Sequence, residues 1–293
     1  MKVDLCVFLA GQHIDEYAPL FLETLQRNCN LTNLTVHVVE KGGIHYTGPP
    51  QGPDESPWYT DLLFKYYVPG VGESVHEYLL KKQKEMDLEI YKKHDAREFF
   101  TQSTPMIPFW HFGDDHGNTL NWAIKNCGVA KWIIFCHSDI VFKKDIVSRH
   151  RESMNDWMGV FGIWNHCYVV NRTAFFATGA RFNCITNFRT MPVHHNGFDC
   201  EIHHAEDPRC NLDKAKIVYG WDVGEHMEMM MWANQWENHI INTVRGPISA
   251  EDLETLSYVD HMCSGHGYVN ETTREYQARR RDQWFNEFNI ARI

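Results

Sequence analysis

The sequence predicts an α/β fold in which helices cover both faces of a mostly parallel sheet. Two apolar runs, residues 3–10 and 34–40, have the composition of strands buried on both faces, and residues 14–27 between them show helical spacing. A strand, helix, strand order of this length predicts a right-handed parallel crossover. A third apolar run, residues 131–136, ends abruptly in polar residues, as a central strand does at a ligand crevice.

The first crossover brings two strand ends together. Pro19 lies inside the helical pattern and suits a first-turn position, which allows the regular helix to begin only there. Lys41, Gly42 and Gly43 are expected to close the second strand. Gly11 and Glu40 would then lie at neighbouring strand ends, an arrangement compatible with a nucleotide pocket, although glycine after a strand is most often a turn residue.

Residues from about 44 to 108 interrupt the alternation of strands and helices. Residues 46–57 are rich in proline and glycine and predict a loop, and residues 74–100 predict a long, mostly charged helix. We expect this region to be an inserted helical segment within a single domain of residues 1–293.

The alternation resumes after the insertion. Residues 107–112 predict a strand, and residues 113–124 a helix that leads to the run at 131–136. Helices at 145–158 and 227–236 and short strands at 160–164 and 167–170 follow. An amphipathic last helix, residues 271–288 within a C-terminal segment of about 268–293, carries four arginines. Such a cluster could clamp a phosphate, but a solvated helix face is more common.

Composition excludes several classes of function. A formal net charge of −10 disfavours an extended nucleic-acid surface and general binding to anionic membranes. No apolar run reaches the roughly 18 residues that a spanning helix needs, and the first ten residues contain Asp4 and are too short for a signal peptide. Nine cysteines without a Cys-x-x-Cys pair indicate reduced thiols, so we expect a cytoplasmic protein.

Residues 179–215 form the least regular part of the sequence. Two histidine pairs, His194-His195 and His203-His204, lie there near Cys200 and raise a zinc hypothesis. Adjacent histidines cannot easily turn toward one ion, and the spacing matches no closed structural zinc site. A polar loop that faces an acceptor is therefore the favoured interpretation.

The polar residues after the run at 131–136 are His137, Ser138 and Asp139. In open α/β sheets ligands bind just outside the carboxyl ends of the strands, so an acidic side chain there is well placed to hold a metal or a substrate. A turn in which these residues merely cap the next segment is the alternative.

Taken together, the sequence resembles the GT-A class of glycosyltransferases, in particular the family-2-like group. The resemblance covers about residues 1–45 and 107–235. It rests on Leu9-Ala10-Gly11, the segment His116 to Ala123, and the segment Phe135 to Ile140. It implies a GT-A, Rossmann-like α/β/α sandwich that transfers a sugar from a nucleoside diphosphate sugar to an acceptor hydroxyl, with metal assistance and with inversion.

In that family an Asp-x-Asp turn holds a divalent cation that bridges the donor's two phosphates. Here His137 replaces the first aspartate, so the resemblance implies Asp139 as a ligand of Mn²⁺ or Mg²⁺. A C-terminal histidine often completes such a site, and His266 or His261 is the candidate. The role of His137 stays open between contact with the donor and shaping the turn.

The resemblance also implies a base and a donor site. Asp222 fits best as the base that deprotonates the acceptor, with Glu225 second and Asp199 or Glu201 as further alternatives. Glu40 stands where the family usually has an aspartate, so UDP is favoured over GDP only slightly. The residues implied at the donor are Leu9, Ala10, Gly11, Glu40, Asn118, Asn121, His137 and Ser138.

Two other classes of function remain as alternatives. A nucleotidyltransferase shares the crossover and the metal carboxylate, but it would carry a Gly-rich basic loop after the first strand, and residues 11–16 lack one. A non-catalytic protein that binds a sugar nucleotide or zinc is the second. The acceptor is open: a glycan, a lipid, a protein and a modified nucleic-acid base all fit, with nucleic acid disfavoured by the net charge.

Overall fold

The central sheet has eight strands. The computed structural model describes residues 1–10, 13–44, 67–93, 108–164, 166–182, 185–189, 194–195, 198–199, 217–221, 224–241, 248–262 and 271–293. The sheet contains β1 (Val3–Ala10), β2 (Leu34–Ile44), β3 (Tyr67–Pro69), β4 (Leu88–Lys92), β5 (Trp132–His137), β7 (Met158–Ile163), β8 (Cys167–Asn171) and β13 (Glu237–Ile241).

The strand order is β13-β7-β8-β5-β1-β2-β3, and β4 also pairs with β2. β1 runs parallel to β2 and β5, and β2 runs parallel to β4. β8 lies antiparallel between β5 and β7, and β3 pairs antiparallel with β2. Six of the eight strands therefore run in one direction, because β13 is parallel to β7. The predicted mostly parallel α/β sheet is confirmed.

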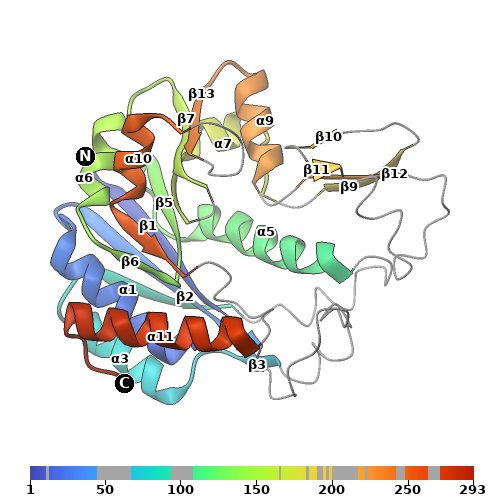
Figure 1. Ribbon diagram of the computed structural model, residues 1–293. Helices are drawn as coiled ribbons and strands as arrows, with labels where there is room; N and C mark the ends of the chain where they lie inside the picture. Colours follow the sequence, from blue (N-terminus) through green and yellow to red (C-terminus); the bar gives the residue numbers. More distant parts are fainter. Residues whose placement is uncertain are drawn as a thin grey trace.

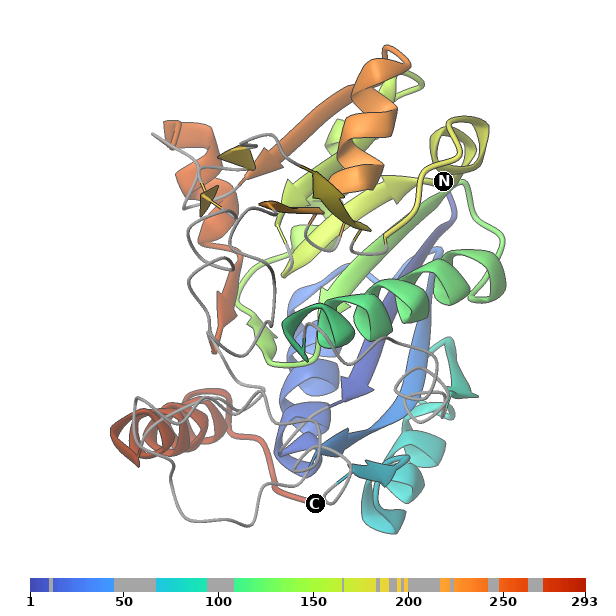
Figure 2. The same cartoon turned by 90° about the vertical axis from the view of Figure 1, so that its right-hand side faces the viewer.

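Helices cover both faces of this sheet (Figure 1). On one face lie α1 (Ile14–Asn28), α3 (Glu73–Lys82), α6 (Ile146–Ser153) and α10 (Ala250–Leu256). On the other lie α5 (Pro108–Asn126), α7 (Arg172–Ala177) and α9 (Glu225–Ala233). Figure 2 shows α5 running across its face of the sheet. The last helix, α11 (Glu271–Phe288), packs against α1, so the layers form the predicted α/β/α sandwich.

The two apolar cores follow from the alternation of side chains along β1. Val3, Leu5, Val7 and Leu9 face the α1 side, whereas Cys6 and Phe8 face the α5 side. A strand between two helix layers needs apolar residues on both faces, which explains why its sequence is a nearly continuous apolar run.

Two predictions near the amino terminus are corrected. α1 begins at Ile14, not at Pro19, and Pro19 lies buried inside it. Burial of the apolar face of α1 outweighs the backbone hydrogen bond that proline cannot donate. β2 is not closed by residues 41–43 but runs on to Ile44: the β1–β2 register shifts so that Ala10 pairs with Gly42, and the end of β2 pairs with β3.

Two further predictions fail around the expected insertion. The helix predicted for residues 74–100 ends at Lys82, and Leu88–Lys92 forms β4 beside β2. Residues 107–112 do not form a strand, since α5 begins at Pro108, where the missing amide hydrogen costs no helical bond. The single domain and the limits of the insertion at 44–108 stay predictions, and the loop predicted at 46–57 lies outside the described residues.

The remaining elements agree with the sequence more closely. α6 ends at Ser153 rather than at 158, β7 and β8 occupy the two predicted strand positions, α9 begins at Glu225, and α11 has the predicted bounds. The irregular region contains short strands: β9 (Ile185–Arg189) pairs with β12 (Ile217–Trp221), and β10 (His194–His195) with β11 (Phe198–Asp199). The side chains on which the zinc hypothesis depends lie outside the described residues.

A small antiparallel ladder joins the C-terminal region to the sheet. It consists of β6 (Ile140–Phe142), which follows β5, and β14 (Val259–His261). Among the helices in the described parts of the chain, none has the length and apolar character needed to cross a membrane.

Candidate functional site

The candidate site begins where β5 ends. His137 is the last residue of β5, and Ser138 and Asp139 form the turn into β6. The apolar residues of β5 bury the strand, so the turn is held against the core: Ser138 and Asp139 are buried, while the His137 side chain keeps 24% of its surface exposed. The His137 amide donates a hydrogen bond to the His166 carbonyl oxygen (3.0 Å). The strand end therefore presents an inward carboxylate beside a half-buried imidazole.

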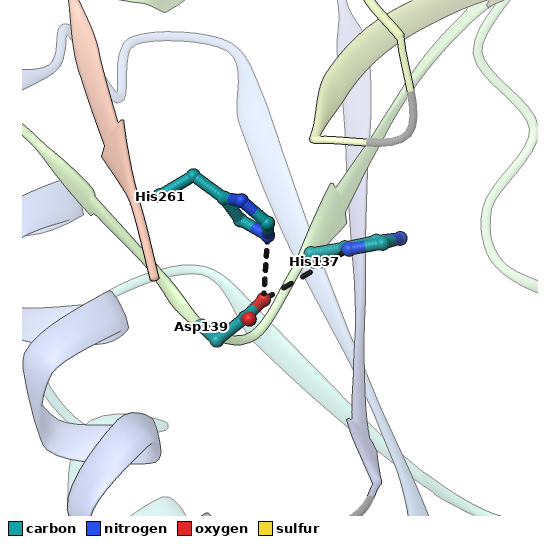
Figure 3. Close-up of side chains that lie close together, drawn as sticks. All are labelled: His137, Asp139 and His261. Carbon is teal, nitrogen blue, oxygen red and sulfur yellow. Dashed lines mark ion pairs between the residues drawn. The ribbon is translucent and has the colours of Figure 1, made fainter. Parts of the chain in front are cut away.

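β14 brings a second histidine to this carboxylate. His261 pairs with Ile140 in the β6–β14 ladder, and the Met262 amide donates to the Asp139 carbonyl oxygen (3.0 Å). His261 Nε2 then lies 3.3 Å from Asp139 Oδ1, as Figure 3 shows. Backbone pairing thus joins residues that are distant in sequence, and of the two histidines predicted as metal ligands the structure places His261 at Asp139.

His137, Asp139 and His261 fit a divalent cation. His137 Nδ1 lies 3.9 Å from Asp139 Oδ1, and one ligand atom from each residue lies within 4.8 Å of the other two. A buried carboxylate with two imidazoles is an established type of ligand set for a dication, and it leaves coordination positions for a substrate. His266, the other predicted metal ligand, lies outside the described residues.

His166 is a member of the site that the sequence did not reveal. It lies in the turn between β7 and β8, and its ring stacks on that of His261 with centroids 3.7 Å apart and planes 20° apart. Burial, assisted by the nearby His261, lowers the pKa of His166 to about 4, although Asp139 opposes the shift. A neutral ring therefore packs on the His261 ligand. The sequence did not reveal His166 because its turn lies beside Asp139 only through the pairing of β8 with β5, which no local pattern predicts.

The C-terminal helix secures β14. Asp260, which precedes His261, accepts hydrogen bonds from Arg280 and from Trp284 Nε1 (3.1 Å), and Lys143 Nζ lies 3.2 Å from its carboxylate. The neighbouring Arg281 is buried and forms an ion pair with Glu16. Arg280 and Arg281 therefore bind carboxylates of the protein itself, which disfavours the phosphate clamp.

The predicted donor residues on β1 and β2 lie at adjacent strand ends. Leu9 pairs with Glu40, and both side chains are buried. The Glu40 carboxylate bonds to His76 Nδ1 of α3 and is thus held by the protein. Ala10 is half-buried, and Gly11 lies outside the described residues. These strand ends lie beside that of β5, because β1 pairs with both β2 and β5.

The two predicted asparagines of α5 differ in their surroundings. Asn118 is exposed, whereas Asn121 Oδ1 accepts a hydrogen bond from the Phe182 amide (3.0 Å). Asn121 therefore connects α5 to the segment after α7. On the same helix, the His116 ring lies edge-on to that of His137, with centroids 5.7 Å apart.

Only one of the two predicted catalytic carboxylates is described. Glu225 is the first residue of α9 and is buried, where the positive end of the helix dipole favours its ionised form. Gly224 before it has φ of 89°, and a Cβ there would lie 3.2 Å from the Trp164 ring, so glycine is required. Asp222, Glu201 and the Asp199 side chain lie outside the described residues.

Comparison with known protein families finds no match, and comparison with curated proteins finds none either. Among solved structures, the galactosyltransferase LgtC with donor and acceptor sugar analogues is 8% identical, with 97% of this chain and 95% of that chain covered and a TM-score of 0.46. The mannosyltransferase PcManGT from Pyrobaculum calidifontis, with GDP-Man and Mn²⁺, is 8% identical, with coverages of 98% and 73% and a TM-score of 0.44.

A structure of S. aureus TarS 1-349 is 12% identical, with a TM-score of 0.37. The match covers 62% of this chain and 50% of that chain, so the present chain spans about half the length of that relative. Identities and TM-scores this low carry no argument about activity.

Proposed function

We propose that this chain is a GT-A glycosyltransferase that moves a sugar from a nucleoside diphosphate donor to an acceptor hydroxyl. The observation that carries the proposal is the group of His137, Asp139 and His261 at the carboxyl end of a central parallel strand. Ligands of open α/β sheets bind outside this edge, so a cation there would meet a diphosphate held at the neighbouring strand ends.

Different residues of the chain hold the cation, contact the donor and accept the proton of the acceptor. Asp139 and His261 hold the cation, which when bound neutralises the charge that develops on the departing diphosphate. The backbone around Leu9, Ala10 and Gly11 approaches the nucleoside, and Ser138 and His137 line the turn beside the phosphates. Asp222, with Glu225 as the alternative, takes the proton from the acceptor hydroxyl. The acceptor oxygen then bonds to the anomeric carbon from the face opposite the departing nucleoside diphosphate, which inverts that carbon.

The identities of the donor base and of the acceptor are the more specific parts of the proposed function. Glu40 on β2, whose carboxylate bonds to His76, is the proposed contact of the base or ribose, and UDP is favoured slightly over GDP. Asn118 and Asn121 remain proposed donor contacts. A glycan, a lipid, a protein or a modified nucleic-acid base remains a candidate acceptor. The described cysteines are free thiols, which suits the proposed cytoplasmic location.

A donor-by-acceptor screen by mass spectrometry, with Mn²⁺ or Mg²⁺ present, tests the proposal. Wild type should transfer a sugar, and Asp139→Asn should lower the rate about 1000-fold, because metal stabilisation of the leaving group is worth several kcal/mol. The matched control is Asp252→Asn, which removes a carboxylate on α10 that pairs with His239 of β13. Equal rates in wild type and Asp139→Asn would refute the proposal, and pyrophosphate release would indicate a nucleotidyltransferase.

A further inference from the structure

We infer that His137 determines the metal preference of this site, and that the site selects a transition-metal dication such as Mn²⁺, Co²⁺ or Zn²⁺ over Mg²⁺. The inference rests on the metal site of the proposed function but not on the transfer reaction itself. It concerns the residue by which this turn departs from a pair of aspartates.

The chemistry of the ligand atoms is the first support. The three side chains offer two imidazole nitrogens and one carboxylate oxygen. Mg²⁺ is a hard cation that binds oxygen and retains much of its water, whereas imidazole suits transition metals and zinc. Among the described residues, this group contributes one carboxylate and therefore one negative charge, which weakens the electrostatic attraction on which Mg²⁺ binding largely depends.

The spacing of the ligand atoms is the second support. His261 turns Nε2 toward the Asp139 carboxylate, whereas the His137 ring extends away from it with Nδ1 as its nearer nitrogen (Figure 3). The two distances, 3.9 and 3.3 Å, are close to the separation of two ligand atoms bound at about 2.1 Å to one metal ion.

Restricted mobility of the two rings is the third support. His137 pairs with Phe8 in the β1–β5 ladder, and its ring contacts the rings of His116 and His166, with centroid distances of 5.7 and 6.1 Å. The stack on His166 orients the ring of His261. Nitrogens held in this way are pre-organised for a metal, and partners of metal-binding histidines tune affinity by about 10 to 100-fold.

Metal titrations of the full chain test the inference, with the metal ions alone as probes. Isothermal calorimetry would measure Kd for Zn²⁺, Mn²⁺ and Mg²⁺, and the visible absorption of Co²⁺ would report nitrogen ligation directly. Wild type should bind Zn²⁺ and Mn²⁺ at least about 100-fold more tightly than Mg²⁺. In His137→Asp the ratio of Zn²⁺ to Mg²⁺ affinity should fall at least about tenfold, because an oxygen replaces a nitrogen.

Two further variants make the test decisive. His137→Gln adds no second carboxylate beside Asp139 and should lower Zn²⁺ affinity without raising Mg²⁺ affinity, which guards against misfolding of His137→Asp. His239→Gln removes an exposed histidine paired with Asp252 and should leave every Kd unchanged.

An unchanged Zn²⁺-to-Mg²⁺ ratio in both His137 variants would overturn the inference, as would equal binding of Mg²⁺ and Mn²⁺ by wild type. The result is separable from the proposed function. If the metal order holds but no nucleotide sugar is consumed, the transferase proposal fails and the role of His137 stands.

Discussion

At the residue scale, the site is organised by one carboxylate withdrawn from water. Asp139 has no exposed surface, and burying a charge is costly unless opposite charge or polar partners offset it. His261 Nε2 lies 3.3 Å from Asp139 Oδ1, and a bound dication would compensate the carboxylate charge. The same geometry thus explains why the turn should bind a cation.

We predict that the His166 imidazole stays neutral through the physiological range. Its pKa is lowered from 6.5 to about 4, first by burial and then by His261. NMR of the imidazole nitrogens during a pH titration should show His166 unprotonated at pH 5.5. A midpoint for His166 near 6.5 would contradict the prediction.

The lowered pKa of His166 also determines whether the free energy of unfolding rises or falls with pH. The unfolded chain binds a proton at His166 near pH 6.5, whereas the folded chain resists it until about pH 4. The contribution of a neutral His166 is therefore complete above pH 6.5 and is lost as the pH falls from 6.5 toward 4. In His166→Phe, which keeps the ring contact with His261, the unfolding free energy should decline less over this interval.

From the sequence, Asp139 was predicted at the sheet edge and His261 was one of two candidate histidines, whereas their neighbours were not predicted; the role of both residues as metal ligands stays a prediction. Asp139 follows a run that can only be a buried strand, so its place at the sheet edge was determined by local pattern. His166 and Asp260 act through a strand pairing and a helix contact made with residues far away in sequence. Single side chains of this kind have no periodicity to mark them, and the role of His137 likewise depended on which way its ring turned.

At the element scale, α11 acts as a support for β14. Arg280 and Trp284 on one helix face meet Asp260, and β14 in turn holds His261 against β6. Trp284 is fully buried, which provides the apolar anchoring that two exposed ion pairs would lack. The C-terminal helix is therefore coupled to the metal ligand through one carboxylate.

We predict that Asp260→Asn weakens metal binding without unfolding the protein. Loss of the charge-assisted bonds to Arg280 and Lys143 should loosen β14 and raise the Kd for Mn²⁺ about tenfold. Calorimetry gives the Kd, and circular dichroism checks that the helix content is unchanged. Asp252→Asn on α10, which breaks the pair with His239 of β13, is the matched control. An equal effect of the two variants would show that Asp260 has no special coupling to the site.

Helices and strands were predictable from the sequence where a local pattern of apolar residues determines them. β1, β5 and α11 were recognised from runs and periodicity alone, because a buried strand or an amphipathic helix needs its pattern whatever surrounds it. The segment Leu88–Lys92 lies within the long, mostly charged helix predicted for residues 74–100, yet it forms β4 through pairing with β2. A five-residue edge strand owes its conformation to its partner, which no local window contains.

At the scale of the whole molecule, the two ends of the central sheet contain polar groups of different kinds. The end at His137 collects polar groups that a ligand would use, whereas the opposite end contains a closed polar cluster centred on Asp4. Arg172 there donates to Asp4 Oδ2 (2.5 Å) and to backbone carbonyls at the end of α5 and in the following loop. Gly128 makes room for the cluster, since a Cβ at that position would lie 2.3 Å from Asp4 Oδ2.

We predict that Asp4→Asn destabilises the fold at neutral pH while leaving metal binding intact. Asp4 has no exposed surface and Arg172 is buried, so removing one charge leaves the other uncompensated, at a cost of about 3 kcal/mol or more in unfolding free energy. Urea unfolding measures this cost, and calorimetry should give an unchanged Kd for Mn²⁺. Asp156→Asn, which removes an exposed partner of Lys131, should unfold at the wild-type urea concentration.

The difference in unfolding free energy between wild type and Asp4→Asn depends on pH through the pKa of Asp4. Burial by itself would raise that pKa, but His37, Arg172 and the Ala130 amide together hold it below the ordinary value of 3.8. The stabilisation is therefore complete above pH 3.8 and is lost as the pH falls through the lowered folded pKa. Wild type and Asp4→Asn should converge in stability only below pH 3.8. Convergence already at pH 5 would mean that the Asp4 carboxylate is not held ionised by Arg172 and His37.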